Sequence, residues 1–460
     1  MASKMDQQSA QELALYLAGR GSASGPEAAR ALGISQPSFS RLVKTMRPNL
    51  LITGRARAVR YAAYRDIPGI GRTVPIYAID TTRQATQIGT LHALRSNGFF
   101  FEASTDDFDS AFFEDLPYFL HDLRPSGFLG RMIPRRHPDL GLPENIQHWT
   151  SNQCLSYLAK YGWNLPGNLI IGEEAFRLYV KNSAIPEAPI SLQDRATIYP
   201  QLADNVLSSG DPGSSAAGEQ PKFIATKGRE RIEVIVKFSP SLTNPVSRRV
   251  GDLLIAEHIA HQTLAAHDHN SVTSEIIETS DRVFLEMERF DRTPQGGRHG
   301  VISLFPLDAQ FVGSLQSWSA TARSLLVQEH IADDVYDEIF WREAFGHLIA
   351  NTDMHSGNLA FFTRGRRLLD VAPTYDMLPM LYAPQQSTIV QRNFIPLTPS
   401  PEHGSIWTSV VDAALEFWTA VASDQRISTD FRYVASGNRS VLEGSRHLAS
   451  FLPVRRGASP

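Results

Sequence analysis

The chain has 460 residues, too many for one ordinary hydrophobic core, so we expect two or three domains. Its 42% hydrophobic and 20% charged residues are typical of a soluble globular protein, and a net charge of −4 argues against coating nucleic acid with the whole surface. The single cysteine, Cys154, excludes an intramolecular disulfide framework and a four-thiolate metal site. No signal peptide and no apolar run long enough to cross a bilayer is visible, so we expect a cytoplasmic protein without membrane association.

Residues 1–66 are predicted to form a winged helix-turn-helix domain. Apolar residues recur at helical spacing over 10–17, and shorter helices are expected over 26–32 and 36–46, separated by a turn that contains glycine. Residues 51–64 then have the pattern of a hairpin with arginines at and beside its tip. In such a domain, the second of two helices joined by a tight turn enters the major groove of DNA.

Basic and polar residues of this segment are the candidates for DNA contacts. The base edges would be read by residues early in the third helix, namely Gln36, Ser38, Ser40 and Arg41. The phosphates would be bound by three further residues, namely Lys44, Arg55 and Arg57. Lysine and arginine outnumber aspartate and glutamate here, which favours DNA over the alternative of a helical protein–protein module. A two-fold operator would be read by a homodimer.

Residues 67–200 are predicted to form a β-rich connecting domain. A linker at 67–72 is followed by expected strands over 73–79, 85–91 and 98–103. The last strand carries three consecutive phenylalanines, which we expect in the core. No catalytic arrangement of residues is visible in this part of the chain.

A segment rich in small residues, 208–218, lies before a predicted strand and is followed by Lys222. Small residues let backbone N–H groups approach phosphate oxygens, and a nearby lysine supplies a compensating charge. Gly213 and Gly218 match only half of a Walker A motif, since lysine and Ser/Thr do not follow them. A flexible linker is an equally good interpretation of this segment.

Residues 231–238 are a predicted strand that ends at Lys237 and Phe238, where a kinase has a lysine for the nucleotide phosphates. The helix predicted over 250–264 carries Glu257, a candidate partner for Lys237. Residues 283–292 form a strand and then a charged turn, where a kinase has the hinge that contacts adenine. Alone, each feature also fits a strand that simply ends in solvent.

Four histidines have spacings that would allow a metal site: His258, His261, His267 and His269. No cluster of carboxylates or thiolates near them completes such a site. We therefore prefer a polar face of the helix as the place of the first two.

Residues 347–376 contain the residue types that phosphoryl transfer by a kinase needs. Asp353 follows a helical run over 324–349, Asn358 comes five residues later, and Asp376 follows a short hydrophobic segment. One acid accepts the hydroxyl proton, and an amide with a second acid holds Mg²⁺. Asp and Asn also populate turns through bonds to the backbone, so the spacing alone leaves a turn as the alternative.

Together these segments resemble the HipA-like serine/threonine kinases, the toxin component of bacterial toxin–antitoxin pairs. The resemblance rests on four motifs in the family's order: Ser215-Ala-Ala-Gly-Glu-Gln-Pro-Lys222, Glu288-Arg-Phe-Asp-Arg292, Asn351-Thr-Asp-Met-His-Ser-Gly-Asn358 and Tyr375-Asp376. It implies an α+β, protein-kinase-like, two-lobed HipA fold, with an ATP-binding lobe over 201–292 and a helical lobe over 293–460. The family's short form borrows its DNA-binding domain from an antitoxin subunit, whereas the predicted domain at 1–66 resembles the longer, YjjJ-type form.

The resemblance also implies roles for individual residues. Asp353 would be the catalytic acid, and Asn358 and Asp376 would hold Mg²⁺. The residues implied for ATP are Lys222, Lys237, Glu257, Glu288, Phe290, Asp291 and His355. Ser215, or its neighbour Ser214, matches the serine that such kinases autophosphorylate. The implied partners are a protein substrate, such as an aminoacyl-tRNA synthetase, and an antitoxin.

The leading hypothesis is thus an ATP- and Mg²⁺-dependent protein serine/threonine kinase with a built-in DNA-binding domain that regulates its own operon. One alternative is a transcription regulator whose kinase-like domain only senses nucleotide. A second alternative is an enzyme acting on DNA, with Asp353, His355 and Asp376 as metal ligands.

Overall fold

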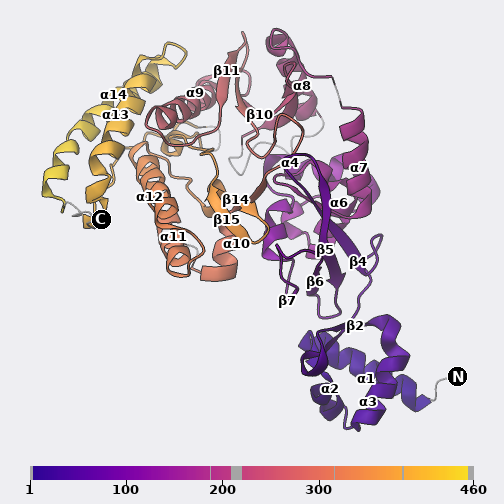
Figure 1. Cartoon of the computed structure of the whole chain (residues 1–460). Helices are drawn as coiled ribbons and strands as arrows, with labels where there is room; N and C mark the ends of the chain where they lie inside the picture. The colour runs from indigo at the N-terminus through magenta and orange to yellow at the C-terminus, as the bar shows by residue number, and fades with distance from the viewer. Residues whose placement is uncertain (1–3, 187, 209–219, 315, 386–387, 454–460) are drawn as a thin grey trace. The chain divides into compact units, whose positions relative to one another are not determined.

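The computed structural model describes residues 4–186, 188–208, 220–314, 316–385 and 388–453 (Figure 1). The chain divides into two compact units. The first comprises residues 1–124 and 140–185, and the second comprises residues 125–139 and 186–460. No helix in the described part of the chain is long and apolar enough to span a membrane. The sequence predicted four segments, 1–66, 67–200, 201–292 and 293–460, which differ from these two units. That division stays a prediction.

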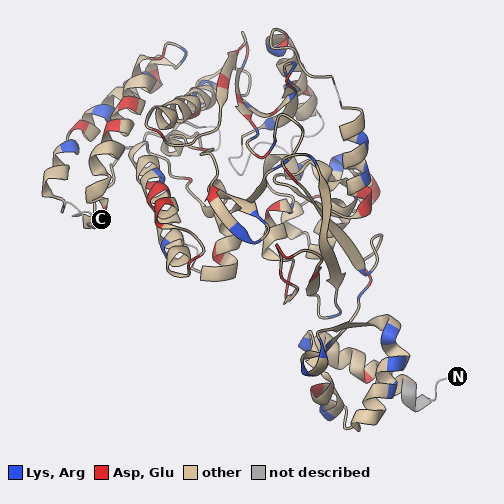
Figure 2. Cartoon of the chain, viewed as in Figure 1, with Lys and Arg blue, Asp and Glu red and all other residues tan. Residues whose placement is uncertain are grey.

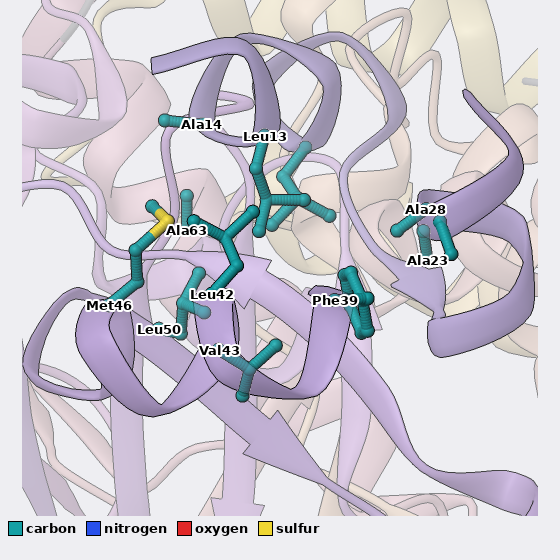
Figure 3. Close-up of a cluster of buried hydrophobic side chains, with 12 residues drawn as sticks. Leu13, Ala14, Ala23, Ala28, Phe39, Leu42, Val43, Met46, Leu50 and Ala63 are labelled. Carbon is teal, nitrogen blue, oxygen red and sulfur yellow. The ribbon is translucent and has the colours of Figure 1, made fainter. Parts of the chain in front are cut away.

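The first unit begins with an N-terminal module, residues 4–63. Its elements are α1 (Lys4–Arg20), β1 (Ala23–Ser24), α2 (Gly25–Ala31), α3 (Gln36–Met46), β2 (Leu50–Thr53) and β3 (Arg60–Ala63). The helices α2 and α3 each begin after a serine, Ser24 and Ser35, whose side chain accepts a backbone N–H three residues on. Figure 3 shows the apolar side chains that close its core, among them Leu13, Phe39 and Leu42.

The predicted linker at 67–72 is a packed turn. Ile67 is buried and exchanges two backbone hydrogen bonds with Gly71, both of 2.9 Å. Beside this turn, Leu51 and Ala62 from the N-terminal module share a small apolar cluster with Leu94 and Phe100 of the following sheet. The chain turns back here because burial of these apolar side chains stabilises contact between the N-terminal module and the sheet.

The following sheet has the strand order β7-β6-β5-β4-β8, with every pairing antiparallel. Its strands are β4 (Thr73–Ile79), β5 (Ala85–Ala93), β6 (Phe99–Ala103), β7 (Ala111–Phe113) and β8 (Leu169–Ile171). The helices α6 (Ser151–Tyr161) and α7 (Glu173–Ala184) pack beside β8. The three predicted strands are confirmed, and the phenylalanines of β6 are buried as expected.

The second unit contains a four-stranded antiparallel sheet in the order β11-β12-β10-β9. Its strands are β9 (Lys222–Lys227), β10 (Ile232–Phe238), β11 (Ser274–Glu278) and β12 (Val283–Glu288). One face packs against α8 (Arg195–Ser208), together with Phe128 of α4 (Gly127–Arg131). The opposite face packs against α9 (Pro245–Ala266), which therefore lies on the side of Lys237.

The remaining elements of the second unit are mostly helical. They are α5 (Ile133–Arg136), β13 (Gly300–Ser303), α10 (Leu304–Leu307), α11 (Trp318–Val327), α12 (Asp333–Leu348), β14 (Ala360–Arg364), β15 (Arg367–Val371), α13 (Trp407–Ser423) and α14 (Thr429–Glu443). The single helical run predicted over 324–349 is two helices, because the chain turns at Glu329, whose φ is +60°. Trp407, Phe417 and Trp418 are fully buried, as predicted.

A buried carboxylate on β12 ties α8 to the sheet. Glu286 has no exposed side-chain surface and accepts hydrogen bonds from Arg195 at 3.0 Å and from Lys227 at 2.7 Å. The hydroxyl of Tyr199 donates to its second oxygen. Burial would raise the pKa of Tyr199, and the bond to Glu286 adds to this effect, so the phenol stays protonated and remains a donor.

We expect Glu286→Gln to lower the free energy of unfolding by about 1–3 kcal/mol, because it removes the buried charged acceptor that Arg195 and Lys227 share, while Glu275 and Glu288 remain beside these cations. Chemical denaturation measures this loss. The matched control is Glu278→Gln on the exposed end of β11, for which we expect a change within about 0.5 kcal/mol. Equal losses for the two variants would contradict the stabilising role proposed for the cluster around Glu286.

Candidate active site

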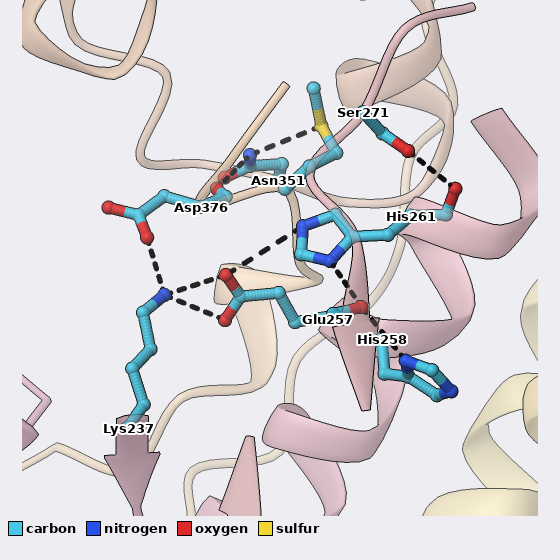
Figure 4. Close-up of polar contacts among 9 residues, drawn as sticks. Lys237, Glu257, His258, His261, Ser271, Asn351 and Asp376 are labelled. Carbon is cyan, nitrogen blue, oxygen red and sulfur yellow. Dashed lines mark hydrogen bonds and ion pairs between the residues drawn. The ribbon is translucent and has the colours of Figure 1, made fainter. Parts of the chain in front are cut away.

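A triad of one lysine and two carboxyl groups forms the centre of the candidate site. Lys237 extends from β10 towards Glu257 on α9 and Asp376 in the loop after β15 (Figure 4). Its Nζ donates to both carboxylate oxygens of Glu257, at 2.6 and 2.8 Å, and to Oδ1 of Asp376. Lys237 and Glu257 are buried, whereas 31% of the Asp376 side chain is exposed. The predicted contact of Lys237 with Glu257 is present, and the contact with Asp376 adds a third member.

The charges of the triad stabilise one another. Burial would lower the pKa of Lys237, but Asp376 and Glu257 outweigh this effect and raise it above the usual range. Burial would raise the pKa of Asp376, but Lys237 and then Lys222 outweigh it and hold that pKa well below the usual range. At neutral pH the site therefore contains an ammonium beside an ionised carboxylate.

Lys222 lies next to the triad. It is the first residue of β9 and is paired directly with Lys237 across the two strands. Paired residues of neighbouring strands point to the same face of a sheet, so both lysines lie on the side of α9. Ser214, Ser215 and the rest of segment 209–219 lie outside the described residues.

The loop after α12 presents Asp353 to solvent. The backbone N–H of Asp353 donates to Oδ1 of Asn351 at 3.0 Å, and Nδ2 of Asn358 donates to the Asp353 carbonyl at 2.9 Å. Asn358 is buried, and this bond uses its nitrogen, which leaves its amide oxygen as the atom for a cation. The turn around Asp353 thus combines the backbone bonding of a tight turn with an exposed carboxylate.

The ring of Tyr375 connects this loop to the segment Glu288–Arg292, here called the hinge. The hydroxyl of Tyr375 donates to the Gly357 carbonyl at 2.8 Å, and its ring stacks on Phe290 with centroids 5.8 Å apart. His355 is exposed, and its Nδ1 accepts the Gly357 N–H at 3.1 Å. Because Nδ1 accepts this bond, Nε2 is the ring nitrogen that can donate to a ligand.

Charged side chains fix the hinge. Asp291 is buried and accepts hydrogen bonds from Arg289, at 2.9 and 3.1 Å, and from Arg292 at 2.7 Å. Glu288 pairs with Lys227 at 3.1 Å on the α8 side of the sheet. A cavity of about 270 Å³ lies against the hinge. The ATP contact implied for Asp291 stays a prediction beside these arginine partners.

The histidines of α9 do not lie on a polar face, contrary to the interpretation of the sequence. His258 and His261 are buried because β11 covers them, and each Nδ1 lies within hydrogen-bonding distance of the Ser274 hydroxyl, at 2.9 and 3.0 Å. Nε2 of His261 is 4.0 Å from Glu257. Among the described residues, no group of three or more His, Cys, Asp or Glu side chains could hold a metal ion.

The residues predicted for DNA belong to the first unit. Gln36, Ser40, Arg41 and Lys44 are exposed on α3, and Arg55 and Arg57 are exposed between β2 and β3. Ser38 is half-buried, and its hydroxyl is bonded to the Ser35 hydroxyl and to Arg41. In Figure 2 the N-terminal module carries more blue residues (Lys, Arg) than red ones (Asp, Glu).

The motifs alone did not reveal every residue that organises the site. Asn351 contacts both the Asp353 loop and the chain at Asp376, and Ser274 joins the two histidines. The spacing Asn351-x-Asp353 was a usable signal, since asparagine often bonds the backbone two residues on. Ser274 carried no such signal.

Comparisons with known proteins identify the family of this chain. Residues 70–180 match the middle domain of YjjJ-like toxins, and residues 214–424 match the HipA-like C-terminal domain. The chain is 37% identical over 423 residues to the toxin YjjJ of Escherichia coli K12, covering 90% of this chain and 94% of that protein. The chain belongs to the HipA-like toxin family. Within the family, the similarity to YjjJ-like toxins that was expected from the sequence is confirmed.

A solved structure of the family shares the fold of this HipA-like chain. It is a chain from the Shewanella oneidensis MR-1 complex of HipA, HipB and operator DNA. The two are 16% identical, with a TM-score of 0.55 over 82% of this chain and 97% of that one. The mixed α and β architecture is therefore that of HipA.

The buried imidazole of His261 should make the stability of this HipA-like protein depend on pH. Burial, followed by the charge of Lys237, lowers the pKa of His261 to about 3 from an ordinary value of 6.5. The folded chain therefore binds this proton less readily than the unfolded chain, so the stabilisation is present above pH 6.5 and falls as the pH decreases towards 3. Between pH 7 and 5.5 we expect a loss of about 1 kcal/mol from this residue.

Chemical denaturation at the two pH values measures this loss in wild type and in His261→Gln, which keeps a polar group but does not titrate. The variant should lose about 1 kcal/mol less than wild type. His447→Gln, which removes an exposed histidine, is the matched control and should follow wild type. Parallel curves for wild type and His261→Gln would refute the assignment.

Proposed function

We propose that this HipA-like chain is a protein serine/threonine kinase that transfers the γ-phosphate of ATP to a hydroxyl. The observation that carries the proposal is the Lys237–Glu257–Asp376 triad, which shares one unit with Asp353 and Asn358. A lysine held by a helix glutamate, an exposed acid and an amide followed by a second acid are the set that phosphoryl transfer by kinases uses.

The donor atoms fit a magnesium nucleotide. Asn358 has its amide oxygen available, and Asp376 has a second carboxylate oxygen beside the one that Lys237 binds. These two oxygens would hold Mg²⁺, which neutralises charge on the phosphates while ATP supplies the transferred group. Lys237, Lys222 and the Nε2 proton of His355 bind phosphate oxygens. The hinge at Glu288 and Phe290 receives the adenine.

Asp353 orients the substrate hydroxyl and accepts its proton. Its carboxylate is exposed, so a protein substrate can reach it without opening the core. The bonds that Asn351 and Asn358 make to its backbone hold the turn while leaving both carboxylate oxygens to the substrate. Positioning of this kind is the main contribution of a kinase to the reaction.

A second function, binding of operator DNA, is proposed for the N-terminal module. Support comes from the order of α2, a turn that contains Gly33, α3 and the pair β2/β3, which is the order of a winged helix-turn-helix domain. The exposed residues on α3 and between β2 and β3 are basic or polar. Regulation of its own operon, as a homodimer or with an antitoxin, follows from this role.

The kinase proposal predicts that wild type incorporates label from γ-labelled ATP, with Ser215 or Ser214 as the modified residue found by mass spectrometry. Asp353→Ala should reduce the rate by about 10²–10⁴-fold, the usual contribution of a general base. The control Asp337→Ala, an exposed carboxylate of α12, should keep the rate. Equal labelling of Asp353→Ala and wild type would remove the assignment.

Two other observations would favour the alternative functions. Nucleotide binding without any transfer by wild type would favour a regulator that senses nucleotide. Nicking of a plasmid with Mg²⁺ and without ATP would favour an enzyme acting on DNA.

The DNA proposal predicts a change in salt dependence. Replacing Arg55 and Arg57 together by glutamine should reduce the slope of log K against log salt by about 1.8, since each phosphate contact contributes about 0.9. A 30-bp duplex of random sequence is the probe, and fluorescence anisotropy measures binding. The control is Arg83→Gln with Arg177→Gln, the same charge change elsewhere in the first unit. An unchanged slope for the first pair, or an equal change for the control pair, would contradict the role.

A further inference from the structure

Asn351 is a buried amide at the centre of the site, with only 3% of its surface exposed. Its Nδ2 donates to the backbone carbonyl of Asp376 at 3.3 Å, and its Oδ1 accepts the backbone N–H of Asp353 at 3.0 Å. Figure 4 shows its side chain directed at the chain of Asp376. One short side chain thus connects the two loops that carry the acids of the proposed reaction.

The backbone around Asn351 needs such a connection. Ala350 has φ of +62° and Asp376 has φ of +52°, values that cost energy for residues other than glycine. Such conformations persist where surrounding contacts determine them. The bond from Nδ2 fixes the backbone carbonyl of Asp376. In the proposed reaction, the carboxylate of this residue would contact Lys237 in the free protein and Mg²⁺ in the complex.

Only an amide satisfies both loops. Asn351 must donate to a carbonyl and accept from an N–H at the same time, and among side chains of this size asparagine does both without a charge. A carboxylate would keep the acceptor but place a negative charge beside the carbonyl oxygen of Asp376. An alanine would leave the N–H of Asp353 and the carbonyl of Asp376 without this partner.

We propose that Asn351 is a positioning residue that sets the distance between the proton acceptor Asp353 and the metal ligand Asp376. The inference rests on the proposed kinase function. Asn351 does not touch the reacting groups and acts through the backbone of both acids.

The test compares Asn351→Ala with Asn438→Ala, a matched loss of a buried asparagine. Asn438 is 6% exposed and accepts a hydrogen bond from Tyr382 at 2.9 Å, away from the two acids. We expect Asn351→Ala to lower kcat by about 100-fold, the effect of misplacing catalytic groups by about 1 Å. The Mg²⁺ concentration for half-maximal rate should rise, while binding of ATP without Mg²⁺ stays unchanged. Asn438→Ala should change none of these, although both variants lose thermal stability.

A second variant keeps the proposal testable if Asn351→Ala fails to fold. In Asn351→Asp the ionised carboxyl lacks the donor, whereas the protonated carboxyl again has both a donor and an acceptor. The ratio of its kcat to that of wild type should therefore rise as the pH falls from 8 to 5.5. A merely structural residue would give a ratio that does not follow pH in this way.

The outcomes separate this inference from the function on which it rests. If wild type transfers no phosphate, the proposed kinase function fails. If wild type transfers phosphate and Asn351→Ala keeps its kcat and Mg²⁺ requirement, or matches Asn438→Ala, this inference alone is overturned. A pH-independent kcat ratio for Asn351→Asp also overturns it.

Discussion

The buried ammonium of Lys237 is the constraint on which the second unit depends. Removing such a charge from water costs several kcal/mol unless opposite charges surround it, and Glu257 and Asp376 do so from two other elements. Strand β10, helix α9 and the loop after β15 must therefore keep their relative positions. Ser274 of β11 contacts α9 through His258 and His261. Ser428 contacts the first turns of α9, because its backbone N–H donates to the buried Asp252.

The sheet carries a second buried ion cluster on its opposite face. Successive residues of a strand point to opposite sides, so Glu286 on β12, paired with Val236, faces α8, whereas Lys237 faces α9. Arg195 and Lys227 neutralise Glu286 as Glu257 and Asp376 neutralise Lys237. The sheet is thus fixed between two helices by charges of opposite sign, and neither helix can shift without uncovering one of them.

Local sequence patterns predicted helices and strands, but they did not predict contacts between residues that are distant in the sequence. The helix over 36–46 and the strands over 73–103 follow from periodicity and turn residues, and the pair Lys237–Glu257 follows from the resemblance. The contact of Lys237 with Asp376 joins residues 139 positions apart, which no spacing reveals. His258 and His261 suggested a polar helix face, since the sequence does not show that β11 covers them.

In the proposed kinase reaction, the charges of the site would make a divalent cation necessary for nucleotide binding. Lys237 and Lys222 carry two positive charges, and Glu257 and Asp376 carry two negative charges when all four are ionised. The polyphosphate would meet a set without net charge, in which Asp376 repels it at short range. If the Asp376 and Asn358 oxygens held Mg²⁺, the cation would offset that repulsion and leave Lys237 for phosphate. In the proposed reaction, the carboxylate that stabilises the buried lysine in the free protein would thus also serve as a metal ligand.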